Sequence, residues 1–191
     1  MQNMLINKLY VVLLILLSSL NVYADSFPSD PFVLYLNNGS NVEITQKGKK
    51  FNAKCHYNGS SISYKINTSL ASHLDKSDEF FFILKVHSKR DLFVILTREP
   101  SRQNHTASFC GAGYEDYLVL IEVSRNKVSV LDAILLQSCL KSILLRTDQG
   151  DDPLQAITVD KEKSSIAFQW LGESEDKKRM LNIKNSHFVL Q

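Results

Sequence analysis

Short apolar segments separated by turn residues make up almost the whole chain beyond residue 30. In 61–66 the apolar positions alternate with polar ones, which is typical of a strand with one face in solvent. In 80–84 and 92–96 the apolar residues are continuous, and such runs predict central strands that are covered on both faces. Asn-Gly pairs at 38–39 and 58–59 separate neighbouring segments and predict two tight β-hairpins.

The whole pattern predicts about a dozen short, mostly antiparallel strands and little helix. The expected strands are 32–36, 41–45, 51–57, 61–66, 80–84, 92–96, 117–123, 127–136, 142–145, 156–159, 164–170, 179–183 and 187–190. A short helical segment at 69–76 and a loop at 148–153 interrupt the series. This succession predicts a single all-β domain, arranged as a sandwich or as a propeller-like meander. The lack of a fixed-length sequence repeat disfavours a regular propeller.

The first 24 residues have the composition of a secretory signal. Lys8 precedes the apolar run 9–17, and Ala24 closes a Val-Tyr-Ala cleavage site. We therefore expect a signal peptide at 1–24, a single secreted β domain at 25–191 and a periplasmic or secreted location. The remaining sequence has no second apolar stretch of membrane-spanning length, so we expect no stable membrane insertion after cleavage.

Charge is nearly balanced along the chain. The 22 Lys and Arg residues are scattered and are matched by 20 Asp and Glu residues. Proteins that bind nucleic acids electrostatically normally carry a basic stripe. We therefore expect no nucleic-acid partner.

The three cysteines, Cys55, Cys110 and Cys139, predict one disulfide and one free thiol in an oxidising compartment. A hairpin centred between Ser124 and Arg125 places residue 110 opposite residue 139, which favours a Cys110–Cys139 disulfide. Cys55–Cys110 is the alternative pairing. Under the favoured pairing, Cys55 is a free and partly buried thiol.

Residues with catalytic or metal-binding chemistry form no recognisable constellation. The five histidines do not have the spacing of a metal site, so we predict neither a metal nor another cofactor. Cys110 lies in the string Cys-Gly-Ala-Gly, which favours a structural half-cystine beside a glycine-rich turn over a nucleophile. We interpret two carboxylate pairs, Glu115 with Asp116 and Glu173 with Glu175, as surface residues, because adjacent exposed carboxylates merely repel one another.

One polar segment, 98–109, is longer than an ordinary hairpin connection and is not explained by the needs of folding. Long loops on a rigid β framework commonly carry binding functions. The candidate partner-binding residues, which offer hydrogen bonds or charges, are Arg98, Ser101, Arg102, Asn104, His105 and Ser108.

A small exported β domain of this kind resembles, in overall build rather than in any motif, the periplasmic immunity proteins that neutralise cell-wall-degrading toxins such as type VI amidase effectors. The resemblance implies a non-enzymatic inhibitor in which a loop plugs the active-site cleft of an exported toxin enzyme. Two other functions stay open. One is a periplasmic hydrolase with a site assembled from Cys110 or His105 with Glu115, and the other is a small-ligand or envelope-scaffold module.

Overall fold

The structure is a computed structural model of the 191-residue chain. It describes residues 32–47, 50–66, 70, 77, 79–101, 113–124, 127–147, 152–174 and 177–191. The predicted signal peptide and nearly all of the predicted helical segment at 69–76 lie outside these residues.

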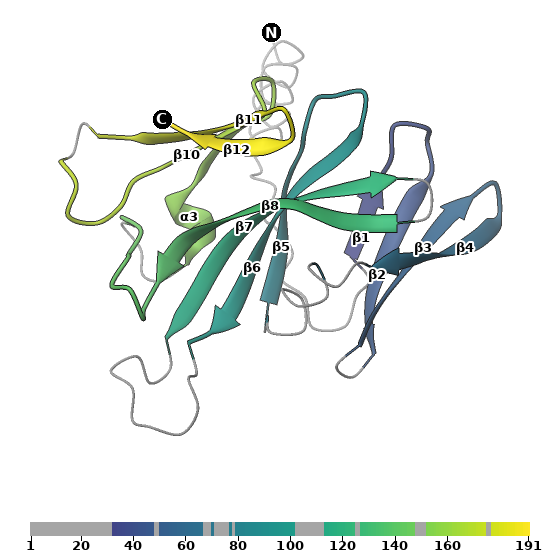
Figure 1. The fold of residues 1–191 in the computed structure, drawn as a ribbon, viewed down its shortest axis with the longest axis horizontal. Coiled ribbons are helices and arrows are strands. Elements are labelled where there is room, and N and C mark those ends of the chain that lie inside the picture. The colour runs from purple at the N-terminus through teal and green to yellow at the C-terminus, as the bar shows by residue number, and fades with distance from the viewer. Residues whose placement is uncertain are drawn as a thin grey trace, which may run out of the picture.

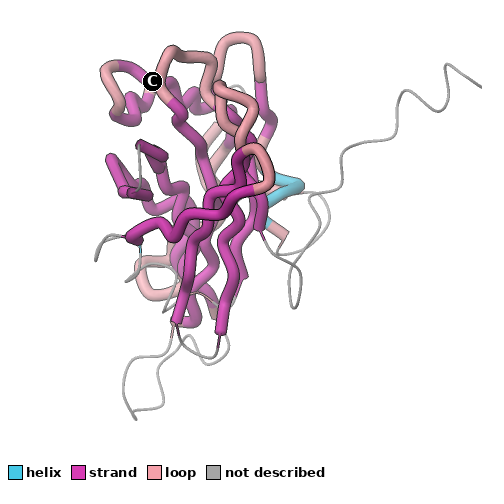
Figure 2. The backbone as a smooth tube through the Cα atoms, turned by 90° about the vertical axis from the view of Figure 1, so that its right-hand side faces the viewer, coloured by secondary structure: helices cyan, strands magenta, loops and turns pink. Residues whose placement is uncertain are grey.

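Twelve strands and one short helix are described. They are β1 (Phe32–Tyr35), β2 (Asn41–Lys47), β3 (Lys50–Tyr57), β4 (Ser60–Ile66), β5 (Glu79–Lys85), β6 (Asp91–Pro100), β7 (Tyr114–Ser124), β8 (Lys127–Ser138), α3 (Pro153–Ala156), β9 (Thr158–Asp160), β10 (Ser165–Phe168), β11 (Arg179–Lys184) and β12 (His187–Leu190). Strands account for most of the described backbone, as Figure 2 shows, and this confirms the predicted all-β class.

The strands form three antiparallel meanders of four consecutive strands, β1–β4, β5–β8 and β9–β12, which we call the N-terminal, central and C-terminal sheets. A short parallel pairing of Lys65 and Ile66 in β4 with Lys127 and Val128 in β8 joins the first two into one eight-stranded order. In Figure 1 the central sheet lies between the other two. The up-and-down connection within each sheet is that of a meander.

The central sheet has a hydrophobic core on each face, because alternate residues of a strand point to opposite sides. In β6, Phe93 and Ile95 pack with residues of the N-terminal sheet. Their neighbours Val94 and Leu96 pack with residues of the C-terminal sheet, and all four are buried. This arrangement explains the continuous apolar run and confirms that β6 is a central strand covered on both faces.

The strand β5 is also covered on both faces, since Phe80 belongs to one core and Phe81 to the other. However, β5 lies at the end of the strand order, so the expectation of a central position is wrong for this strand. An apolar run reports how many faces of a strand are covered, whereas an edge position depends on the hydrogen-bonding partners.

The β3–β4 hairpin has the two-residue turn that its Asn-Gly pair predicts. Asn58 and Gly59 both have positive φ, 47° and 78°, and Tyr57 pairs with Ser60. Two consecutive positive φ values define the turn type whose twist matches that of the flanking strands. The alternation in 61–66 continues directly from this turn.

The β7–β8 hairpin has a different register from the one that the sequence suggested. Ser124 pairs with Lys127, which moves the centre of the turn by one position. Two β-bulges then shift the register further, and the Cys139 N–H donates to the Tyr114 carbonyl at 3.2 Å. The predicted register, which placed residue 110 opposite residue 139, is therefore wrong. Neither bulge leaves a signal in the apolar pattern.

Two further predictions are corrected by the structure. Residues 148–151 of the expected loop at 148–153 lie outside the described residues, but Pro153 belongs to α3, whose first turn it occupies and which the Asp152 carboxylate caps by accepting from the Leu154 N–H at 3.0 Å. The expected strand at 142–145 is wrong. It makes only isolated bridges, from Ile143 to Ser138 and from Leu145 to Trp170.

Candidate binding surface

At one end of the central sheet, β6 leads into the 102–112 segment and β7 returns from it. The Ser101 N–H donates to the Gly113 carbonyl at 2.8 Å, and Pro100 pairs with Tyr114. The described residues on either side of this segment are therefore held next to each other by the ladder. We call the polar residues around this closure, which are Arg98, Ser101, Glu115 and Asp116, the sheet base.

Arg98 and Asp116 are cross-strand neighbours in β6 and β7 and form a two-pronged ion pair. Arg98 Nε lies 2.9 Å from Asp116 Oδ1, and Nη2 lies 3.2 Å from Oδ2. Burial raises the pKa of Asp116 above its ordinary value, and the Arg98 guanidinium opposes this rise. The guanidinium also lies 4.9 Å from the ring centre of Tyr114 and 3.7 Å from Glu79 Oε2. Arg98 is thus held from several sides.

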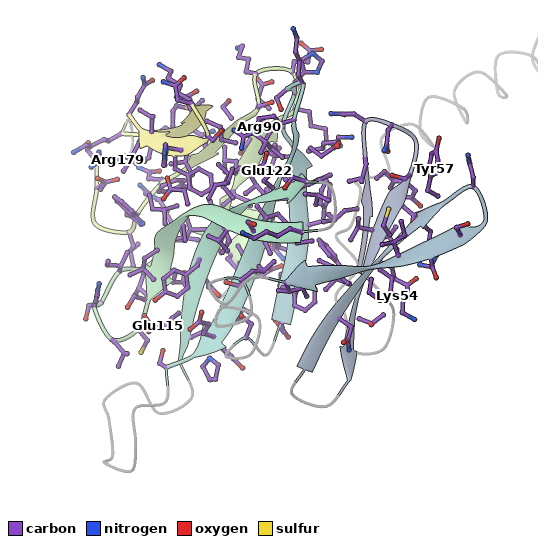
Figure 3. All side chains as sticks on the ribbon, turned by 45° about the vertical axis from the view of Figure 1, so that its right-hand side comes forward. Lys54, Tyr57, Arg90, Glu115, Glu122 and Arg179 are labelled. Carbon is purple, nitrogen blue, oxygen red and sulfur yellow. The ribbon has the colours of Figure 1, made fainter. Side chains whose placement is uncertain are left out.

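Glu115 is bound separately, because neighbouring residues of a strand point to opposite faces. Its Oε1 accepts from Ser101 Oγ at 2.6 Å and from the Leu140 N–H at 3.2 Å. Figure 3 shows Glu115 at the end of the central sheet opposite to Arg90 and Glu122.

Both carboxylates of the base are buried, so interpreting Glu115 and Asp116 as surface residues is wrong. The reason is the turn after β8. It folds back over the start of β7, where the Cys139 and Leu140 N–H groups bind the Tyr114 carbonyl and the Glu115 carboxylate. This contact brings together residues that are distant in sequence, and no local pattern indicates it.

Four exposed apolar side chains lie on segments that backbone hydrogen bonds join to the sheet base, directly or one after another. Tyr114 begins β7, Leu140 and Leu144 belong to the segment after β8, and Leu171 follows β10. Backbone hydrogen bonds join the segments: Cys139 N–H to the Tyr114 carbonyl, and Leu171 N–H to the Leu144 carbonyl at 2.8 Å. We call these four residues the apolar rim. Exposed apolar side chains that gather in one place often mark an interaction site.

The position of Leu171 is fixed by its neighbour Trp170. The Trp170 indole N–H donates to the Leu136 carbonyl at 2.9 Å, which ties β10 to the edge of β8. The Arg179 guanidinium lies 5.4 Å from the Trp170 ring centre and pairs with Glu173. The hydrogen bonds from Arg179 lower the pKa of Glu173. Glu173 was expected to be a surface residue and is only partly exposed; Glu175 lies outside the described residues.

Of the six predicted partner-binding residues, two fall within the described part of the chain. The side chains of Arg98 and Ser101 are both bound inside the protein, to Asp116 and Glu115. They anchor the segment rather than offering free groups to a partner. The other four, Arg102, Asn104, His105 and Ser108, lie outside the described residues. Sequence reasoning missed the apolar rim, because its members come from separate segments that are each short.

Two of the three cysteines, Cys55 and Cys139, lie within the described residues, and one is a free thiol while the other is a half-cystine. Cys55 is free and buried in the core of the N-terminal sheet. Its neighbour His56 points to the other face, where Nε2 lies 3.1 Å from Glu43 Oε2. Cys139 is disulfide-bonded. Its predicted partner Cys110 lies outside the described residues, so this pairing stays a prediction.

Among the described residues, no three His, Cys, Asp or Glu side chains gather in a way that would hold a metal ion. Within the same residues, no helix has the length and hydropathy needed to cross a bilayer. Comparisons with protein families, with curated proteins and with solved structures found no match.

Proposed function

We propose that the protein is an exported, non-enzymatic domain that binds and inhibits a protein partner through the apolar rim and the adjoining 102–112 segment. The observation that carries the proposal is the exposure of Tyr114, Leu140, Leu144 and Leu171, which lie on segments joined to one another and to the sheet base by backbone hydrogen bonds. Hydrogen bonds and an ion pair hold the backbone of this surface in place before a partner arrives. A surface that is already ordered loses little conformational entropy on binding.

The chemistry of the sheet base favours binding over catalysis. A catalytic carboxylate must be able to exchange a proton with a substrate. Glu115 instead accepts hydrogen bonds from Ser101 and from the Leu140 backbone, and Asp116 is inaccessible and paired with Arg98. The hydrolase alternative relied on Glu115 together with Cys110 or His105, and its one described member is occupied by these contacts.

Export is part of the same proposal. The disulfide at Cys139 supports an oxidising compartment, since structural disulfides are rare in the cytosol. A periplasmic location would place the rim within reach of secreted enzymes. The resemblance in build to immunity proteins then suggests a partner of the cell-wall-degrading kind, such as an amidase.

The proposal is tested by identifying a partner and then perturbing the rim. Partner candidates are captured from an envelope extract of the source organism with the tagged protein and are purified for titration calorimetry. Leu144→Asp combined with Leu171→Asp should weaken binding by about a hundredfold or more, because buried apolar anchors dominate interface energies. Tyr35→Asp, an exposed aromatic residue at the far edge of the N-terminal sheet, is the matched control and should bind as wild type.

A second variant addresses the segment. Residues 102–108 are replaced by a Gly/Ser linker, and Ser101 is kept because it holds Glu115. We expect this variant to lose inhibition of the partner enzyme. Wild-type binding by both variants would overturn the proposal. The purified protein is also tested on peptidoglycan fragments. If it hydrolyses them and the His105→Ala variant does not, the binding proposal is overturned in favour of the hydrolase alternative.

A further inference from the structure

The β3–β4 hairpin extends beyond the core of the N-terminal sheet. The inward face of β3 is buried at Ala53 and Cys55 but is 53% exposed at Tyr57, two residues closer to the turn. Ile62, which pairs with Cys55 and lies on the same face, is 59% exposed. In Figure 1 the tip of the hairpin projects away from the central sheet, although the other end of β4 pairs with β8, and Figure 3 labels Tyr57 on the hairpin.

Among the described residues, no strand lies beside one edge of this hairpin. β4 pairs with β3 from Ser60 to Tyr64, whereas its pairing with β8 begins only at Lys65 and Lys127. In an antiparallel hairpin the two residues that flank a two-residue turn form a hydrogen-bonded pair, in which the N–H of each binds the carbonyl of the other. Such pairs recur at every second position along the strands. Ser60 and Ile62 therefore direct their backbone groups towards β3. Ser61 and Ser63 direct theirs outward, and both residues are exposed.

The other described edges carry features that discourage pairing with a further strand. β5 has a β-bulge between Phe82 and Leu84 and charged residues, Glu79 and Lys85, at its two ends. β8 has two bulges, and β1, β9 and β12 have four residues or fewer. Such features are the usual protection of sheet edges. Residues Ser60–Tyr64 of β4 contain no charge, no proline and no bulge.

We propose that this edge of β4 pairs with β4 of a second copy of the chain, so that the protein forms a two-fold dimer. The sequence Ser61-Ile62-Ser63 reads the same in both directions, so an antiparallel pairing of two copies about Ile62 places serine opposite serine and Ile62 opposite Ile62. With Ile62 on the two-fold axis, Ser61 of each copy lies opposite Ser63 of the other. The outward N–H and C=O groups of Ser61 and Ser63 in each copy then form hydrogen bonds with those of the other copy. The pairing between the two copies ends before Lys65, because the pairing of β4 with β8 begins at that residue.

The dimer would also cover the exposed apolar side chains. The two Ile62 side chains would face each other as a cross-strand pair on the side of the sheet that carries Tyr57. The proposal does not depend on the proposed function, because the apolar rim lies at the end of the central sheet and takes no part in this contact.

Sedimentation equilibrium of the purified protein is the first test, and the expected mass is that of two chains. Ile62→Lys places like charges directly opposite each other and should abolish the dimer. Ser63→Pro removes an outward N–H without affecting the bonds to β3, and it should also give monomer. Tyr35→Lys, at the opposite edge of the same sheet, is the control and should remain dimeric.

The register is tested by a disulfide. In the proposed pairing the two copies of residue 62 form a non-hydrogen-bonded pair with Cα atoms about 4.5 Å apart, a separation that a disulfide can bridge. Ile62→Cys in a Cys55→Ala background should therefore become covalently dimeric on mild oxidation. The Cys55 substitution is needed because Cys55 pairs with Ile62 within one chain.

Two results would overturn the proposal. One is a wild-type protein that stays monomeric up to its solubility limit. The proposal also fails if the chain stays monomeric and the Ser61 and Ser63 amides are protected from hydrogen exchange by a strand of another protein instead of a second copy. The other is a dimer that persists with wild-type affinity in folded Ile62→Lys and Ser63→Pro variants.

Discussion

At the sheet base, polar side chains satisfy one another inside the protein, whereas the β3–β4 hairpin leaves apolar side chains and a strand edge open to solvent. Asp116 is completely inaccessible and is held by Arg98, while Ile62 is mostly exposed. Both regions contradict the simple rule that charges lie outside and apolar residues inside. The base achieves this because Arg98 pairs with Asp116, while the Ser101 hydroxyl and the Leu140 N–H bind Glu115. Within the described part of one chain the hairpin has no such compensation, which is why we assign it a partner.

The difference shows which parts of the molecule serve the fold and which remain available for binding. Residues of the base are bound by at least one other part of the chain, and removing one leaves its partner unsatisfied. Residues of the hairpin tip and the apolar rim have few contacts to lose. Substitutions should therefore be costly to stability at the base and nearly silent for stability at Ile62 and Leu171.

The largest effect is expected for Arg98→Met, which leaves Asp116 buried without its counter-charge. Loss of one partner of a buried ion pair typically costs about 3–5 kcal/mol, and we expect a loss in this range in the free energy of unfolding at neutral pH. Urea denaturation measures it. Arg90→Met, which breaks the exposed pair with Glu122 at the other end of the sheet, is the control and should change little. Equal losses in the two variants would show that the base is not specially dependent on its ion pair.

Core packing gives the next largest contrast. Leu96→Ala removes a fully buried side chain between the central and C-terminal sheets and should cost about 3 kcal/mol. Ile62→Ala, measured at a concentration where the protein is monomeric, should cost less than about 0.5 kcal/mol, because the side chain is already in solvent. A large loss for Ile62→Ala in the monomer would mean that the hairpin packs within its own chain.

Much of the fold could be predicted because the signals are local. The Asn-Gly pair at 58–59 sets the turn of β3–β4, and the continuous apolar run of β6 indicates that both faces are covered. The β7–β8 register was not predictable, since nothing in the apolar pattern of β7 and β8 marks its two bulges. The short helix α3 was missed because a single turn has no periodicity to detect.

Less of the candidate site could be predicted. Arg98 and Ser101 were predicted to bind a partner, but their side chains bind Asp116 and Glu115 within the chain. Their burial depends on the turn after β8, whose Leu140 N–H closes over Glu115. Only a tertiary contact decides whether such adjacent carboxylates are exposed, and a single sequence does not contain that information.

The titration of Asp116 should have a smaller effect on the free energy of unfolding, and the sign of its pH dependence is defined. Its pKa is raised in the folded protein, so between the ordinary carboxyl value, about 3.9, and the higher folded value the folded state binds more protons than the unfolded state. The contribution of this group to stability therefore falls as the pH rises through that window and is constant above it. Stability curves of wild type and Asp116→Asn should differ in this slope. A slope of opposite sign would mean that Arg98 outweighs burial at this site.

The smallest expected effect concerns the turn that presents Ile62 to solvent. Gly59 has a φ of 78°, and a Cβ added there would meet no atom within 4 Å, so Gly59→Ala is disfavoured only by its backbone conformation. We expect a loss of about 1 kcal/mol in the free energy of unfolding, measured by urea denaturation of the monomer. Gly59→Asn should cost less, because asparagine tolerates this conformation better than alanine does. Equal stability of the two variants would mean that the turn does not keep the positive φ at residue 59. The β3–β4 register, on which the outward direction of the Ser61 and Ser63 backbone groups depends, would then not be set by this turn. A difference of the expected sign, together with an unchanged mass in sedimentation, would separate the local stability of the hairpin from its ability to pair with a second copy.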